Sequence, residues 1–217
     1  MKKSNKTKWI DVSLPIYNGM SSWPSDPSVE ISAFKSIAQG RRSNVSLLKF
    51  GSHVGTHMDA PKHVFKDGKS IDALSLESLI GPARVIDIHN PVAITAAELK
   101  KHSLCKGQRV LFKTRNSTFS LKKKCFYKDF VYLALDAANF LAKRQVALIG
   151  VDYFSIGGYE HSDGIAVHKA ILKKDICVVE SLNLSSVLAG WYDMICLPLR
   201  LQNGDGAPAR VVLRKIV

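Results

Sequence analysis

The chain has 217 residues, of which 46% are hydrophobic and 23% charged. This composition is typical of a folded domain with an apolar core and excludes a disordered or fibrous chain. Lys and Arg outnumber Asp and Glu by 31 to 18, which gives a formal net charge of +13. The basic residues are spread along the chain without regular aromatic neighbours, so nucleic acid is not the expected partner. We expect one domain over residues 1–217.

The sequence shows no apolar segment suited to export or to a membrane. The N-terminus is basic but leads into Trp9 and Asp11 without the apolar stretch of a secretory signal. The longest apolar stretch, 130–142, is interrupted by Asp136 and Asn139 and is shorter than the roughly 20 residues that a spanning helix needs. The four cysteines form no Cys-x-x-Cys pair. We therefore expect a cytoplasmic protein with reduced thiols and no membrane partner.

Hydrophobic periodicity predicts alternating strands and helices along the chain. The first part is rich in strands, expected at 9–14, 29–34 and 44–50, and is followed by a helical turn at 74–79 and a buried strand at 83–88. Thr95 is expected to cap a helix that runs to residue 102, with Glu98 at the capping-box position. The second part predicts strands at 109–114, 146–151, 176–180, 191–199 and 209–216 and helices at 134–144 and 167–174. The pattern indicates an α/β protein with antiparallel additions to its sheet.

A histidine cluster lies in residues 53–63. Three of the seven histidines of the chain stand here together with an aspartate. Any one of these histidines alone would be an ordinary surface or core residue, but imidazole and carboxylate together are donors that Zn²⁺ and Mn²⁺ prefer. His53, His57 and Asp59 thus form a plausible set of three ligands. Residues four apart on an extended strand lie roughly 13 Å apart, so the backbone is expected to bend at Gly55.

His63 is the remaining histidine of the cluster. Pro61 fixes the backbone path after Asp59, which directs His63 back toward the site. An imidazole with an ordinary pKa near 6.5 is suited to moving a proton at neutral pH. The sequence therefore predicts His63 as a general acid and base.

Residues 53–63 resemble the signature His-x-Gly-Thr-His-x-Asp-x-Pro-x-His of the metal-dependent cyclase and kynurenine formamidase family, with every signature position filled. The likeness extends over nearly the whole chain, through residues 11–13, 23–26, 150–155, 197–199 and 204–210. The resemblance implies a swivelling β/β/α fold with a mixed sheet. It also implies homodimers or tetramers in which the N-terminal segment helps to line a neighbour's site.

The resemblance implies further site residues that nothing in the neighbouring sequence would single out. His168 and Glu180, twelve residues apart, match the family's second pair of metal ligands, and Trp23 matches an aromatic wall of its substrate pocket. Nearby acidic residues and His161, within the loop 160–163, fall outside the matched spacing and are expected to be loop surface. Three positions depart from the family's pattern, namely Ser25, Gly157 and Ser181.

The function that follows is metal-dependent hydrolysis of a small amide, either an N-formyl arylamine or a cyclic amide. One or two divalent ions, Zn or Mn, would activate water, and Asp59 would bridge two ions if both were bound. Two alternatives stay open at this point. The chain could be a basic nucleic-acid-binding protein with a structural metal, or a family member that binds metal without turnover.

Overall fold

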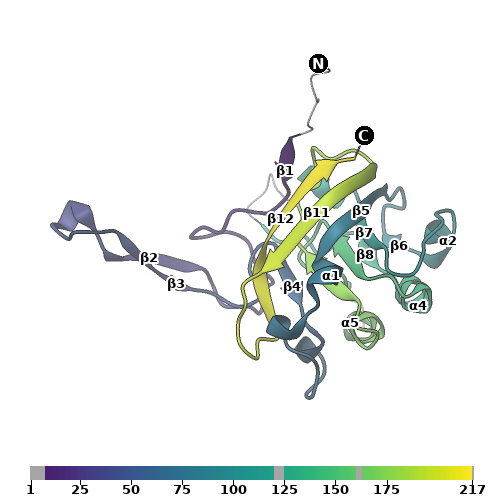
Figure 1. Cartoon of the computed structure of the whole chain (residues 1–217), viewed down its shortest axis with the longest axis horizontal. Helices are drawn as coiled ribbons and strands as arrows, with labels where there is room; N and C mark the ends of the chain where they lie inside the picture. Colours follow the sequence, from purple (N-terminus) through teal and green to yellow (C-terminus); the bar gives the residue numbers. More distant parts are fainter. Residues whose placement is uncertain (1–7, 120–124, 160–162, 217) are drawn as a thin grey trace.

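The computed structural model describes residues 8–119, 125–159 and 163–216. Seven strands form a closed ring in the order β12-β11-β5-β7-β9-β10-β4, because β4 pairs with both β10 and β12 (Figure 1). They are β4 (His57–Asp59), β5 (Ile80–Asp87), β7 (Arg109–Lys113), β9 (Leu148–Val151), β10 (Cys177–Glu180), β11 (Gly190–Pro198) and β12 (Gly206–Lys215). Strand β1 (Trp9–Asp11) extends the sheet along β12. Strands β5, β7, β9 and β10 are parallel and the remaining pairs antiparallel, which confirms the mixed α/β sheet.

The two longer of the five described helices cover the outer face of the parallel strands. The longer ones are α4 (Leu135–Arg144) and α5 (Gly164–Leu172), and the shorter ones are α1 (Leu76–Leu79), α2 (Ala96–Leu99) and α3 (Asn116–Phe119). Two short strands, β6 (Ala93–Ile94) and β8 (Tyr132–Leu133), pair beside them, and 3-10 turns lie at Ile37–Gln39, Pro61–His63 and Ile71–Ala73. Thr95 caps α2 as expected, since its Oγ1 accepts from the Glu98 amide at 3.3 Å. The expected capping box is only half formed, because the Glu98 carboxylate accepts from the amide of His89 instead.

Two apolar cores lie on opposite faces of the same strands. Side chains alternate along a strand, so Val85, Leu111 and Val179 fill the interior of the ring. Ile86 and Val178 point outward and pack with α4 and α5. Parallel strands buried on both faces read as continuous apolar runs, which is why the sequence predicts them well. Met58 of β4 points into the ring, so its neighbours His57 and Asp59 face outward, toward α5.

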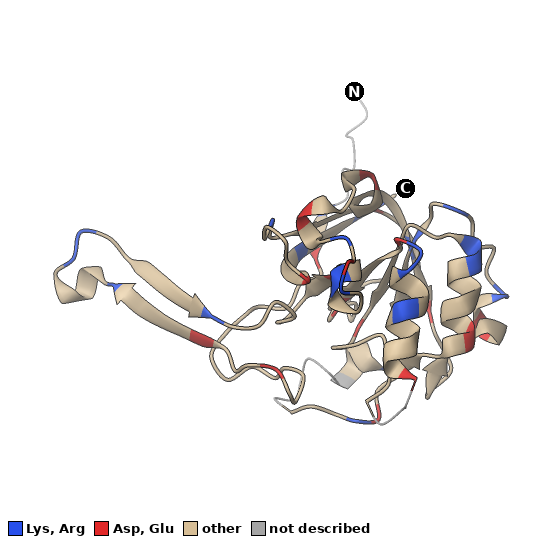
Figure 2. Cartoon of the chain, turned by 90° about the horizontal axis from the view of Figure 1, so that it is seen from below, with Lys and Arg blue, Asp and Glu red and all other residues tan. Residues whose placement is uncertain are grey.

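The hairpin of β2 (Glu30–Lys35) and β3 (Val45–Lys49), here called the arm, projects from the body (Figures 1 and 2). Both strands were expected from the sequence, but they pair with each other rather than with the ring. Several large apolar side chains of the arm are exposed, namely Phe34, Ile37, Val45, Leu47 and Leu48. The structure of the arm therefore leaves a long apolar surface uncovered within the described chain.

Charged residues are distributed over the body and the arm. Figure 2 shows Lys and Arg on the arm and on several helices and loops, with Asp and Glu among them. None of the helices in the described ranges is long and apolar enough to cross a bilayer.

Candidate metal centre

The backbone bends at Gly55 and brings the first two motif histidines together. Gly55 has a φ of +58°, in the left-handed region that glycine adopts at little cost. The ring centroids of His53 and His57 are 5.0 Å apart. The bend expected from the sequence is thus present, and strand β4 begins directly after it at His57.

Strand pairing brings the distant ligand candidates to the same place. Glu180 is the last residue of β10 and stands opposite His57 in the antiparallel pair, and its Oε2 lies 3.2 Å from His57 Nε2. His168 reaches in from α5, with its Nε2 3.4 Å from Glu180 Oε1 and 3.7 Å from Asp59 Oδ2. His53 Nδ1 lies 2.9 Å from Asp59 Oδ1. The five residues that the sequence analysis put forward as metal ligands therefore form one cluster.

Backbone carbonyls fix the orientation of two of these imidazoles. His57 Nδ1 lies 2.8 Å from the carbonyl oxygen of Gly55, and His168 Nδ1 lies 2.8 Å from that of Gly164. A carbonyl oxygen only accepts, so each Nδ1 carries a proton and donates it. The Nε2 atoms, which face the carboxylates, are the positions left for an ion.

Without a metal, the cluster is compensated by protons. Burial lowers the pKa of His168, but its hydrogen bond to Glu180 and the charges of Glu180 and Asp59 outweigh burial and raise that pKa to about 9. Burial also lowers the pKa of His53, yet the contacts with Asp59 and Asp205 raise it to about 9. Burial would raise the pKa of Asp59, but His53 and His57 hold it well below its usual range. The protons held by His53 and His168 thus balance the negative charge of the buried carboxylates of Asp59 and Glu180, at the place where a cation would fit.

The donor set fits a divalent ion. Three imidazoles and two carboxylates are the donors that Zn²⁺ and Mn²⁺ take, and the ligand atoms of His53, His57 and Asp59 lie within 4.8 Å of one another. Asp59 Oδ2 is buried and accepts no hydrogen bond from any described residue. A buried carboxylate oxygen left without a donor is costly, and a bound cation would satisfy it.

His63 lies at the rim of the cluster. It ends the 3-10 turn that Pro61 begins, and its side chain is 30% exposed. Its ring centroid is 4.2 Å from that of His53 and 5.7 Å from that of His168. Burial and the charges of these two histidines lower the pKa of His63. His63 is therefore neutral, and able to accept a proton, at a pH where His53 and His168 are charged.

Trp23 belongs to an aromatic cluster rather than to the donor cluster. Its ring meets Phe126, Phe130 and Tyr159 edge to face, with centroids 5.2, 6.4 and 5.3 Å away. Tyr153, which stacks on Phe130, begins a loop whose Ile156 amide donates to Glu180 Oε1 at 2.6 Å. The aromatic cluster and the donor cluster are thus joined by this short loop.

Several residues escaped the sequence analysis. Asp205 lies 2.9 Å from His53 Nε2 and 4.0 Å from His63 Nδ1, although its segment was noted only as part of the family resemblance. Phe126 and the aromatic residues around it carried no signal of their own. Glu160 and His161, expected to be loop surface, lie outside the described residues, and Asp163 is half-buried at the start of α5.

Two of the departures from the family pattern lie beside the donors. Gly157 packs on α5, where a Cβ would come within 2.8 Å of the Gly164 carbonyl oxygen. Ser181 follows Glu180 with a φ of +58°, and its buried Oγ has no hydrogen-bond partner in the described ranges. Both departures therefore sit where the backbone is tightly constrained.

Known proteins are similar to this chain in sequence and in fold. A family model described as a putative cyclase matches residues 10–157. The kynurenine formamidase of Bacillus anthracis is 36% identical over 211 residues, which cover 97% of this chain and 99% of that protein. A solved structure described as a potential metal-dependent hydrolase with cyclase activity is 32% identical, with a TM-score of 0.84 over 97% of this chain and 99% of that one. Isatin hydrolase A from Ralstonia solanacearum, 22% identical with a TM-score of 0.81, covers 96% and 92% and shows the fold alone.

The closed ring, the donor cluster and these relatives together define a metal-dependent hydrolase. The family model covers well over half of the sequence, and the curated relative spans nearly all of it. The chain belongs to the cyclase family.

Proposed function

We propose that this chain hydrolyses a small amide, with an N-formyl arylamine as the substrate class, and that His53, His57, Asp59, His168 and Glu180 hold the metal. The observation that carries the proposal is the convergence of these five side chains around an unsatisfied Asp59 oxygen, with neutral His63 at the rim. A divalent ion bound there would polarise the amide carbonyl and lower the pKa of water toward neutrality.

His63 moves the proton. One of its imidazole nitrogens accepts a proton from water as the oxygen attacks the carbonyl carbon, and returns it to the amide nitrogen as the C–N bond breaks. The products are a carboxylic acid and an amine, so the atoms balance without any further reactant. Burial lowers the pKa of His63, and a cation bound beside it would disfavour its protonated form as the charged His53 and His168 do in the metal-free protein, so the neutral form that this step needs is favoured.

The aromatic cluster supports an aryl substrate. Trp23 and Phe126 offer ring edges and faces against which an arylamine would stack, and the B. anthracis relative is a kynurenine formamidase. The test is a panel of N-formyl arylamines, lactams and lactones assayed with the metal-loaded protein. Turnover of formyl arylamines is expected. A metal-loaded protein that turns over no amide would favour the alternative that the chain is a family member that binds metal without catalysing hydrolysis.

We propose two ions per chain, Zn or Mn. Asp59 Oδ1 faces His53 and His57, whereas Oδ2 faces His168, so the carboxylate is placed to bridge two positions. Elemental analysis of protein purified without chelators tests this. Less than about 0.2 ion per chain, with no uptake of added Zn²⁺ or Mn²⁺, would contradict the metal site.

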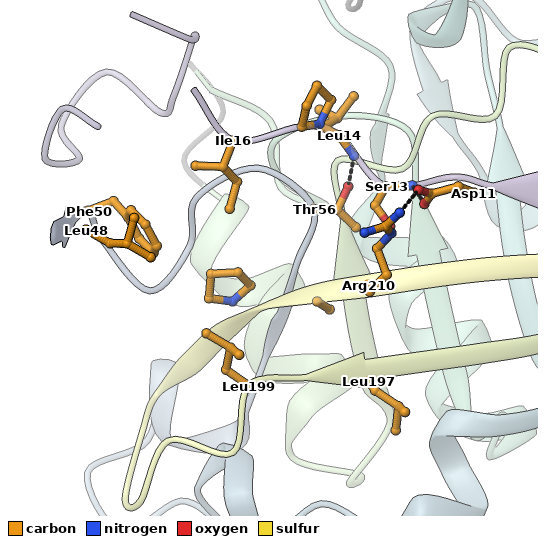
Figure 3. A pocket seen from close by; sticks show the side chains of 13 residues that line it. Asp11, Ser13, Leu14, Ile16, Leu48, Phe50, Thr56, Leu197, Leu199 and Arg210 are labelled. Atoms are coloured by element: carbon orange, nitrogen blue, oxygen red, sulfur yellow. Dashed lines mark hydrogen bonds and ion pairs between the residues drawn. The ribbon is translucent and has the colours of Figure 1, made fainter. Parts of the chain in front are cut away.

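We further propose that a second copy of this chain covers the arm. A lone two-stranded hairpin is marginally stable in water, and Phe34 and Leu47 of the arm are 67% and 58% exposed. A groove of about 560 Å³ lies at the base of the arm. It is lined largely by apolar side chains, among them Leu48, Phe50 and Leu199 (Figure 3). These surfaces support a homodimer or tetramer.

Light scattering of size-fractionated protein tests the assembly. Leu47→Asp should shift the protein toward the monomer, whereas Val92→Asp, at an exposed apolar residue of the body outside the arm, should leave the assembly intact. A monomeric wild type would refute the proposal.

We also propose a cytoplasmic location. The four cysteines are unpaired thiols, which supports a reducing compartment.

A further inference from the structure

Three of the proposed ligands, His53, His57 and His168, are histidines. Each has a second ring nitrogen that points away from the other donors. For His57 and His168 that nitrogen donates to a backbone carbonyl, of Gly55 and Gly164. For His53 it is Nε2, which meets the side chain of Asp205 at 2.9 Å. His53 is thus the member of the set whose orientation depends on another side chain.

Asp205 is held firmly to the motif although 152 residues separate it from His53. Its carbonyl oxygen accepts from the amide of Ala60 at 2.9 Å, and Ser52 Oγ donates to both carboxylate oxygens at 3.2 Å. The next residue, Gly206, leaves room for the imidazole, because a Cβ there would lie 2.7 Å from His53 Cε1. Both ends of the motif therefore fix Asp205 against the His53 ring.

We propose that Asp205 is a positioning residue that accepts the Nε2 proton of His53 and thereby directs Nδ1 toward Asp59 and the ion. The inference rests on the metal site proposed above. A carboxylate that orients a metal-bound imidazole also raises its basicity, and loss of such a partner usually costs about 10–100-fold in metal affinity. The geometry gives Asp205 the role that backbone carbonyls fill for the other two histidines.

A different role must be separated from this one. His53, His63 and Asp205 themselves offer three ligand atoms within 4.8 Å of one another, so Asp205 could bind an ion directly. The two roles differ in what they demand of the side chain. A hydrogen-bond acceptor can be neutral, whereas a neutral amide is a poor substitute for a carboxylate ligand of Zn²⁺ or Mn²⁺.

The experiment measures the affinity of Asp205→Ala and Asp205→Asn for Zn²⁺ by competition with a coloured chelator, and records the visible absorption of the Co²⁺-loaded proteins. Asp205→Ala should bind Zn²⁺ about 10–100-fold more weakly. Asp205→Asn should recover most of that loss and keep the wild-type Co²⁺ spectrum, because its amide oxygen accepts the same proton. Asp193→Ala is the control, since Asp193 pairs with Arg214 away from the cluster.

The outcomes separate this inference from the proposed function. If Asp205→Asn loses affinity as fully as Asp205→Ala, or if Asp205→Ala binds like wild type, the positioning role is overturned while the metal site stands. If wild type binds no metal, the proposed function fails and this inference fails with it. Because affinity and spectrum are measured without substrate, a metal-loaded protein that does not turn over amides leaves the positioning result intact.

Discussion

Gly206 offers a sharp test of where His53 lies. Gly206 stands opposite Asp59 in the pairing of β12 with β4, and a Cβ at this position would lie 2.7 Å from His53 Cε1 and 2.8 Å from the Met58 carbonyl oxygen. Carbon atoms make favourable contacts at about 3.5 Å or more, so in Gly206→Ala the imidazole must retreat by roughly 1 Å. The Met58 backbone is held by sheet pairing on both sides, so it can move less than the His53 ring. The imidazole is therefore the group expected to shift.

Gly206→Ala should therefore lower Zn²⁺ affinity by about 10–100-fold and cost about 1–3 kcal/mol of unfolding free energy through overpacking. Gly150→Ala is the matched control. Its Cβ would meet Leu111 Cδ2 at 2.5 Å inside the ring, so a similar loss of stability is expected without a change in the donors. Affinity comes from chelator competition and stability from urea unfolding of the metal-free proteins. If Gly206→Ala is destabilised yet binds Zn²⁺ like wild type, His53 is not a ligand in this position.

Three further predictions concern the proton, the substrate and pH. His63→Asn should keep its metal but lower kcat by about 10²–10⁴. His89 is an exposed histidine outside the cluster, so His89→Asn should leave kcat unchanged. Equal rates in His63→Asn and wild type would show that His63 is not the base. Trp23→Leu should raise KM for aryl formamides more than for formamide itself, and an equal rise for both would speak against an aromatic wall. The metal-free protein should lose stability as pH rises from about 6.5 through about 9, because His53 and His168 hold protons more tightly when folded than when unfolded. Unfolding measured in chelator across this range checks the sign, and a stability that rises there would contradict it.

Local patterns were sufficient for most of the elements. The helix expected at 134–144 is observed at Leu135–Arg144, and the strand expected at 191–199 at Gly190–Pro198. Period and apolar content are properties of neighbouring residues, so they can be read without knowledge of the fold. The helix expected at 167–174 is observed at Gly164–Leu172. Its earlier start was not predicted because glycine has a low intrinsic helix propensity, and the close approach of Gly164 to Gly157 is a contact between segments that the local pattern does not contain.

Contacts between distant segments were not predictable in the same way. The strand β4 is only three residues long and reads as part of a loop motif, so neither it nor the closure of the ring was foreseen. The partnership of Asp205 with His53 depends on that closure. His168 and Glu180 came from family resemblance alone, since nothing in their own surroundings distinguishes a ligand from an ordinary buried polar residue.

Strand β4 links metal binding to the stability of the fold. Its three residues join β10 to β12 and so close the ring, yet so short a strand offers few backbone hydrogen bonds. Two of its side chains, His57 and Asp59, are proposed ligands, and an ion would tie them to Glu180 on β10 and His168 on α5. A ligand that binds the folded form alone adds about 2.7 kcal/mol of stability at 100 times its Kd. A shortage of metal would then reduce the fraction of folded protein as well as the catalytic rate. Amide hydrogen exchange at Met58 should report the opening of this strand.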